Sequence, residues 1–165
     1  MKCSMCGSKL ATDTEASFHY TSSGLSRVYL KGIKVHKCSN SECGEEEVEI
    51  QNIVELHNLL AEIIAKQENK FVPEEIRFLR THLGYSGVDF SRKMGVDAAT
   101  VSRWENGKTA MGETAERLLR IMILAKTAPI TDYELMDRMA QKEAGQAKKR
   151  TLKMSKAHWI EDKAG

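Results

Sequence analysis

Four cysteines lie in the first quarter of the chain, in two closely spaced pairs. Two residues separate Cys3 from Cys6, four separate Cys38 from Cys43, and the sequence has no other cysteine. A cysteine thiolate can bind zinc or another soft metal, act as the nucleophile of a thiol oxidoreductase, or form a disulfide. These three chemistries are the candidates for the cluster.

The pairing favours a metal. Each pair can form a tight turn, here called a knuckle, that presents two thiolates on one side, and Gly7 and Gly44 follow the knuckles where the backbone must fold back. Two facing knuckles form the tetrahedral four-cysteine site of structural zinc ribbons, which leaves no coordination position for water. We therefore expect one structural Zn²⁺ per chain, with iron in the same ligands as the main alternative. The longer second knuckle stays within the spacing that zinc sites use.

The other chemistries fit less well. The N-terminus lacks the basic-then-apolar layout of a signal peptide, so we expect a cytoplasmic protein, in a compartment where structural disulfides are rare. Thiol oxidoreductases place their cysteine pair at a strand-to-helix turn, and residues 1–9 predict neither element. Four buried cysteines without a metal would not need to be paired. His19 and His36 are spare ligands that a full set of four thiolates does not require.

A second pattern, in residues 75–122, has the signals of short helices joined by turns. Ser86 is a good helix N-cap with Asp89 three residues later, and the helix it begins is expected to break at Gly95. Asp97 caps the next helix, whose core-facing residues would be Val101 and Trp104 and which Asn106-Gly107 would end. Two short helices joined by such a turn are what a DNA-reading helix-turn-helix requires, although helix pattern alone also fits a plain bundle.

The exposed face of the second helix would enter the major groove of double-stranded DNA. Arg103 is its one long donor and can fork onto a guanine edge, the alanines can touch thymine methyl groups, and Lys108 can reach a phosphate. The predicted DNA-binding residues are Ala98, Ala99, Thr100, Ser102, Arg103 and Lys108.

The elements that position these residues divide the chain. Residues 18–38 and 45–50 have the β-branched and aromatic content of short strands, and apolar residues recur at helical spacing over 53–69. We predict an α+β protein. Its expected parts are a small zinc-ribbon-like β domain with one connecting helix (residues 1–70), an all-α helix-turn-helix domain (71–128), and a helical extension with a mobile basic tail (129–165). In that tail Lys148, Lys149, Arg150, Lys153 and Lys156 could contact DNA phosphates.

Composition narrows the function classes. With 41% hydrophobic and 29% charged residues the chain is typical of a folded domain, and no apolar run is long enough to span a membrane. Lys and Arg number 8 against 10 acidic residues in residues 1–70, 9 against 7 in 71–128 and 8 against 6 in 129–165, so a polyanion is expected to bind the later segments. The sequence contains no glycine-rich phosphate loop and no His-Glu-x-x-His motif, and we expect no enzymatic activity.

The run 101-VSRWENGKTAMGETAERLLR-120 resembles the Xre/Cro/lambda-repressor-like helix-turn-helix family, in which a similar Ser-Arg-Trp-Glu-x-Gly run ends the recognition helix. Together with the N-terminal cysteine pair and 28-VYLKGIKVHKC-38, residues 1–125 resemble the MqsA/YgiT-type proteins, which join a zinc finger to such a domain. The resemblance implies that the four cysteines bind zinc and that Arg103 contacts DNA. The chain departs from the family pattern at Ala99, where many members carry a polar residue, and at Gly87, where many carry a phosphate-binding glutamine.

The resemblance also implies a function. In that family the finger domain binds a toxin, commonly one that cleaves mRNA, and the helix-turn-helix domain dimerises and represses the promoter of its own operon at a palindromic operator. We therefore expect a sequence-specific transcriptional repressor that is also an antitoxin, acts as a homodimer and associates with the bacterial nucleoid. The alternative functions are a stand-alone zinc-containing regulator without a toxin partner and, from another class, a thiol enzyme that uses Cys3 and Cys6.

Overall fold

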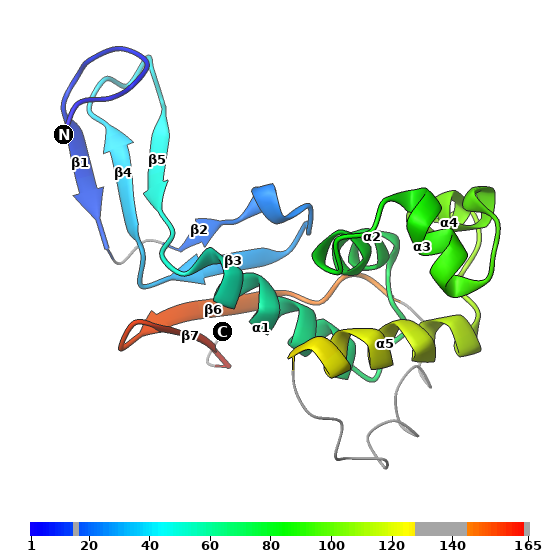
Figure 1. Ribbon diagram of the computed structural model, residues 1–165. Helices are drawn as coiled ribbons and strands as arrows, with labels where there is room; N and C mark the ends of the chain where they lie inside the picture. Colours follow the sequence, from blue (N-terminus) through cyan, green and yellow to red (C-terminus); the bar gives the residue numbers. More distant parts are fainter. Residues whose placement is uncertain (15–16, 128–144, 164–165) are drawn as a thin grey trace. The chain divides into compact units, whose positions relative to one another are not determined.

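A computed structural model describes residues 1–14, 17–127 and 145–163 of the chain, which divides into two compact units (Figure 1). The first, the sheet unit, consists of residues 1–21, 27–55 and 149–165. The second, the helical unit, consists of residues 22–26 and 56–148. The order of elements, strands first and then five helices, agrees with the predicted mixed α+β fold. Among the described residues, no helix combines the length and apolar character needed to cross a bilayer.

A three-stranded antiparallel sheet carries the cysteine-rich turns. It consists of β1 (Leu10–Asp13), β4 (Lys34–Cys38) and β5 (Glu46–Glu49) in the order β1-β4-β5. Leu10 pairs with Cys38 and Val35 with Val48, so the register of β4 places Cys38 beside the chain that leaves the first knuckle. Strands were predicted within residues 18–38 and 45–50, and β4 and β5 confirm this, whereas β1 was not predicted.

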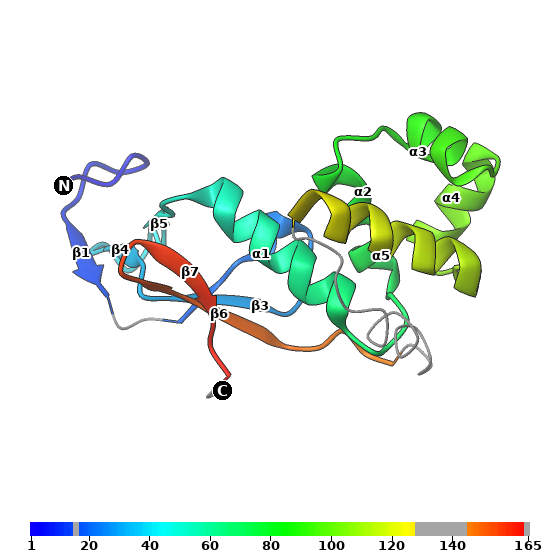
Figure 2. The ribbon, with the colours of Figure 1, turned by 60° about the horizontal axis from the view of Figure 1, so that its bottom comes forward.

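A second sheet of four strands joins the two ends of the chain. It contains β2 (Phe18–His19), β3 (Val28–Lys31), β6 (Arg150–Ser155) and β7 (His158–Glu161) in that order. A short 3-10 helix, Thr21–Ser23, lies between β2 and β3 in the sequence. Strands β3 and β6 pair in parallel, whereas the other neighbours are antiparallel, and in both views β6 runs beside β3 (Figures 1 and 2).

The prediction of a mobile basic tail is wrong for residues 150–161. These residues form a hairpin whose first strand buries Arg150, Thr151 and Leu152, and the indole Nε1 of Trp159 donates to the Gln51 carbonyl at 2.9 Å. The residues of this segment do not identify its pairing partner, because β3 lies far away in the sequence. The predicted helical stretch 131–144 lies outside the described residues.

The helical unit contains α1 (Ile53–Lys66), which begins in the sheet unit, α2 (Pro73–His82), α3 (Gly87–Met94), α4 (Ala98–Glu105) and α5 (Glu113–Thr127). Apolar side chains recur at three- and four-residue spacing along these helices and are buried, as an amphipathic pattern requires. The buried set includes Leu60, Ile64, Ile76, Leu79, Phe90, Val101, Trp104, Leu119 and Ile123.

A buried ion pair within α5 also contacts the backbone of the segment between α1 and α2. The Arg120 guanidinium donates to the Glu116 carboxylate at 2.6 Å, and each side chain is only 1% exposed. The same guanidinium donates to the backbone carbonyl of Ala65, in the last turn of α1, where carbonyls have no partner within the helix. It also donates to the carbonyls of Gln67 and Asn69, which follow α1. The pair therefore fixes the course of the segment that precedes the helix-turn-helix.

Candidate metal centre and nucleic-acid interface

The first knuckle is a tight turn closed by backbone hydrogen bonds. The Cys3 amide donates to the Ser8 carbonyl at 2.8 Å, and the Gly7 amide donates to the Cys3 carbonyl at 3.0 Å. Gly7 has a φ of 72°, in the left-handed region that favours glycine, so the backbone folds back at the position that the sequence predicted.

The second knuckle is closed in a similar way despite its two additional residues. The amides of Cys43 and Gly44 donate to the Asn40 carbonyl at 3.1 and 3.4 Å, and Gly44 has a φ of 62°. The Asn40 side chain accepts from the Glu42 amide at 3.1 Å, and the Asn40 amide points at the Cys38 sulfur, 3.4 Å away. Asn40 thus absorbs the extra length inside the turn and keeps both thiols on one side.

The two knuckles bring all four sulfurs together. The Cys3 and Cys43 sulfurs are 3.8 Å apart, those of Cys6 and Cys38 are 3.4 Å apart, and all four lie within 4.8 Å of one another. These distances are too long for a disulfide, whose sulfurs are about 2.05 Å apart. Metal–sulfur bonds of about 2.3 Å in a tetrahedron would separate the sulfurs by about 3.8 Å. The four cysteines therefore lie close enough to bind one metal ion.

The ionisation of the thiols is consistent with this reading. Hydrogen bonds from the Ser8 hydroxyl and amide lower the pKa of the Cys6 thiol to about 6. At Cys38 the Asn40 amide acts in the same direction, but desolvation and the neighbouring thiols outweigh it and raise the pKa of that thiol to about 12. One negative charge in the cluster thus opposes the ionisation of its neighbours, a cost that a bound cation removes.

The two spare histidines are not part of the cluster. His36 is buried, and its two ring nitrogens lie 2.9 Å from the Thr12 hydroxyl and 3.2 Å from the Glu49 carboxylate. His19 belongs to the other sheet, where its ring stacks on Tyr29. Among the residues that the structure describes, the four cysteines are the one group of possible ligands close enough to share a metal.

Sequence reasoning missed a contact that links the first knuckle to the sheet. The Ser4 amide donates to the Glu47 carboxylate at 2.9 Å, and this bond lowers the pKa of the Glu47 carboxyl. One member of the acidic run Glu45–Glu47 thus helps to orient a knuckle. No local pattern predicts this, because the partner is 43 residues away.

The helix-turn-helix forms as the sequence predicted. The Ser86 hydroxyl accepts from the Asp89 amide at 3.1 Å at the start of α3, and Gly95 ends that helix in the left-handed conformation with a φ of 68°. The Asp97 carboxylate accepts from the Thr100 amide at 2.7 Å at the start of α4. These caps fix where α3 stops and α4 begins, and therefore the turn between them.

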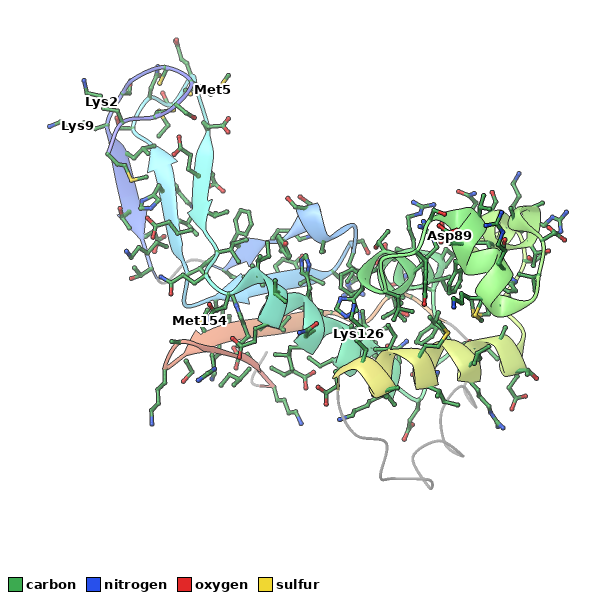
Figure 3. All side chains as sticks on the ribbon, viewed as in Figure 1. Lys2, Met5, Lys9, Asp89, Lys126 and Met154 are labelled. Atoms are coloured by element: carbon green, nitrogen blue, oxygen red, sulfur yellow. The ribbon has the colours of Figure 1, made fainter. Side chains whose placement is uncertain are left out.

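Helix α4 separates a buried face from a solvent-facing one. Val101 and Trp104 are buried, as predicted. Five of the six residues predicted to bind DNA are exposed, namely Ala98, Ala99, Ser102, Arg103 and Lys108. Thr100, the sixth, is half-buried and its hydroxyl is 3.1 Å from the Asp97 carboxylate, so it takes part in the helix cap. Figure 3 shows polar side chains projecting from α3 and α4 around the labelled Asp89.

Two arginines of α2 hold the end of α4, a feature that sequence reasoning also missed. Arg80 forms a two-pronged ion pair with the Glu105 carboxylate, with N–O distances of 2.5 and 3.1 Å. Arg77 donates to the Glu105 carbonyl at 3.0 Å and to the Asn106 side chain at 3.3 Å. Glu105 is the glutamate of the Ser-Arg-Trp-Glu run by which the chain resembles the helix-turn-helix family. Its place in that motif was the one signal in the sequence that could have indicated this contact. The pair orients the helix that would face DNA.

The basic residues of the tail, predicted to contact DNA phosphates, differ in their burial and their partners. Arg150 is buried, and its amide donates to the Arg27 carbonyl at 2.9 Å. Lys153 forms an ion pair with Asp162. The four cysteines and the tail residues from Lys149 onward belong to the sheet unit, whereas the exposed face of α4 belongs to the helical unit.

In a comparison with known families, residues 76–123 match the family described as Helix-turn-helix. The matched segment runs from α2 into α5 and includes all of α3 and α4. It is therefore a helix-turn-helix domain of the Xre type, a class that suggests a DNA-binding transcriptional regulator and is generally non-enzymatic. No curated protein and no solved structure matches the chain.

Proposed function

We propose that this protein is a sequence-specific, non-enzymatic transcriptional repressor that binds double-stranded DNA as a homodimer through α4. The observation that carries the proposal is the capped, exposed face of α4 inside a segment that matches the helix-turn-helix family. In this proposal Arg103 forks onto a guanine, Ala98 and Ala99 contact thymine methyl groups, and Ser102 and Lys108 contact the backbone. Thr100 acts mainly by capping α4. Such a repressor works in the bacterial cytoplasm, on nucleoid DNA.

The metal in the four-cysteine site is proposed to be Zn²⁺, one per chain. Four thiolates around one ion, with no histidine or carboxylate in the set, suit a structural zinc site. When bound, zinc would replace the repulsion between thiolates with four bonds and hold the knuckles of a zinc-ribbon-like sheet together. The protein's own part is the backbone of the two turns, which presents the sulfurs from one side.

We further propose that the sheet unit binds a toxin, so that the protein is the antitoxin of a toxin–antitoxin pair. The support is the resemblance of residues 1–125 to zinc-finger antitoxins, together with separate units for metal and DNA. Co-expression with the product of the adjoining gene, followed by size-exclusion chromatography, tests this part. A stable complex that survives Arg103→Ala supports it. The absence of any complex leaves the stand-alone zinc-containing regulator.

The DNA-reading proposal is tested with an operator duplex selected by the protein from a random-sequence pool. Arg103→Ala is expected to weaken binding by about 1–3 kcal/mol and to relax the preference at one base position, because it removes a base contact. The matched control is Arg117→Ala, which removes an exposed arginine on α5 that pairs with Glu113. Equal effects of the two substitutions would contradict the placement of α4 in the groove, as would an affinity that does not fall with salt.

A further inference from the structure

The register of the four-stranded sheet sorts its side chains onto two faces. Residues opposite each other on neighbouring strands share a face. One face carries Val28, Leu30, Leu152 and Trp159, all of which are buried. The other face, here called the basic face, carries His19, Tyr29, Lys31, Lys153 and Ile160, together with the buried Thr151 and, at the hairpin end, Ser155 and His158. Lys149 lies next to it, before the start of β6. The basic face therefore consists of residues from both ends of the chain.

The basic face has an aromatic row at its edge strand. The rings of His19 and Tyr29 stack with centroids 4.8 Å apart and an angle of 16° between their planes. His19 is exposed, Tyr29 is half-buried, and the Lys149 ammonium lies 5.4 Å from the centre of the Tyr29 ring. A pair of stacked rings with a cation over one of them is a flat, polarised surface on which another planar ring can stack.

The adjacent row of the basic face is positively charged. Lys31 and Lys153 are cross-strand partners, and both approach the single carboxylate of Asp162, at 3.2 and 3.4 Å. The Asp162 side chain is only 8% exposed, whereas those of the two lysines are 42% and 44% exposed. One largely covered carboxylate thus orients two lysines, and Lys149 adds a third cation to the face. Three lysines therefore lie along this part of the face, two of them on either side of one shared carboxylate.

From this arrangement we infer that the basic face binds single-stranded RNA, with an unpaired base stacked on the His19–Tyr29 pair and phosphates on Lys31, Lys149 and Lys153. Aromatic rings next to a cationic row are the means by which proteins hold single strands without reading their sequence. A duplex hides the faces of its bases, so a stacking surface has no use for one. We choose RNA over DNA because RNA strands are commonly unpaired, whereas cellular DNA is paired. This inference does not rest on the DNA-binding role of α4.

Other classes of partner would contact only the lysines or only the rings of the basic face. An acidic peptide would pair with the lysines but would leave the stacked rings without a counterpart. A membrane surface would require several exposed apolar side chains, and Ile160 is the one large apolar residue in the paired rows of this face. These partners are treated below as outcomes that would overturn the inference.

The test uses the full-length protein and a fluorescently labelled ten-nucleotide oligouridine, with binding followed by anisotropy. We expect binding that weakens with salt, a loss of about fivefold or more for His19→Ala, and near-normal binding for His19→Phe, which keeps a stacking ring. The double variant Lys149→Gln/Lys153→Gln should lose about tenfold or more. The matched control is Lys9→Gln, which removes an exposed lysine at the knuckle end of the other sheet (Figure 3).

Several results would overturn the inference. They are no binding of oligouridine, an equal loss for Lys9→Gln and the basic-face variants, or tighter binding to oligothymidine DNA or to acidic lipid vesicles. Loss of RNA binding in Arg103→Ala would assign the RNA to α4 instead. Because the operator assay depends on Arg103 and the oligouridine assay on His19, failure of one proposal is distinguishable from failure of the other. Circular dichroism of each variant shows whether the sheet is intact.

Discussion

The sheet unit and the helical unit are stabilised by different interactions. In the part of the helical unit that the structure describes, each of the helices α1 to α5 buries apolar side chains, and the Glu116–Arg120 ion pair is buried as well. The cysteine-bearing end of the sheet unit has few such side chains, and Met1 and Met5 there are each 74% exposed. A segment with so little apolar surface to bury needs another source of stability. The comparison supports the proposal that a metal held by the four cysteines would take the place of a core at this end of the unit.

The largest expected effect comes from removing the metal. A strong chelator, or Cys38→Ser, should disorder the knuckles and β1, β4 and β5, because no bound metal would then hold the cysteine side chains of the two knuckles together. Amide signals of α2–α5 should remain. The measurement is two-dimensional NMR with metal analysis by mass spectrometry. The exposed-residue variant Ser41→Ala in the second knuckle should retain one metal per chain. Simultaneous loss of both units on chelation would contradict the division of roles.

The corresponding break in the helical unit is Arg120→Met. It removes the charged partner of a buried carboxylate and the Arg120 hydrogen bonds to three backbone carbonyls, so we expect a loss of about 3–5 kcal/mol in the free energy of unfolding. Urea denaturation measures it. The control is Arg117→Met on the same helix, whose pair with Glu113 is exposed and should contribute about 1 kcal/mol or less. Similar losses for the two variants would show that burial of the pair is unimportant.

The C-terminal hairpin sharpens the comparison within the sheet unit. Leu152 is fully buried and pairs with Leu30, so Leu152→Ala should cost about 2–5 kcal/mol. Ile160→Ala, in the other strand of the hairpin, removes a side chain that is 40% exposed and should cost much less. Thermal unfolding of the two variants measures both losses of stability. A Leu152→Ala variant as stable as the unmodified protein would mean that β6 contributes little to the unit.

The smallest expected effect concerns the cap of α4. The Thr100 amide and hydroxyl hold the pKa of the Asp97 carboxyl below its usual value, so the folded state favours the charged form. The resulting stabilisation is present above the unfolded pKa of about 4 and is lost as the pH falls through the lower folded value. Asp97→Asn keeps a capping oxygen without the charge. Its deficit in melting temperature against the unmodified protein should therefore narrow from pH 6 to pH 3, whereas a constant deficit would contradict the assignment.

Local patterns predicted the helical unit well. The caps at Ser86 and Asp97, the stop at Gly95 and the buried Val101 and Trp104 all follow from interactions within a few residues, and the structure confirms each of them. The two knuckles were equally predictable, because cysteine spacing and a following glycine define such a turn. The close approach of the four cysteine sulfurs could be inferred because two such knuckles commonly bind one metal ion.

Long-range partners could not be predicted in this way. Lys31 and Asp162 are 131 residues apart, and no residue in 150-RTLKMS-155 indicates that this segment pairs with β3. Arg120 was an ordinary helix residue in the sequence, and only the fold surrounds it with carbonyls. The tail was misjudged because a basic composition predicts solvation, whereas pairing with β3 covers Arg150 and its neighbours.

The sequence by itself determined where the helices of the helix-turn-helix begin and end and which thiols form a set, because both depend on residues close together in the chain. The tertiary structure alone decided that the two ends of the chain share a sheet, and hence that His19, Tyr29, Lys31 and Lys153 lie on one face. A strand can pair with a partner that lies anywhere in the sequence, so the residues of the strand do not identify that partner.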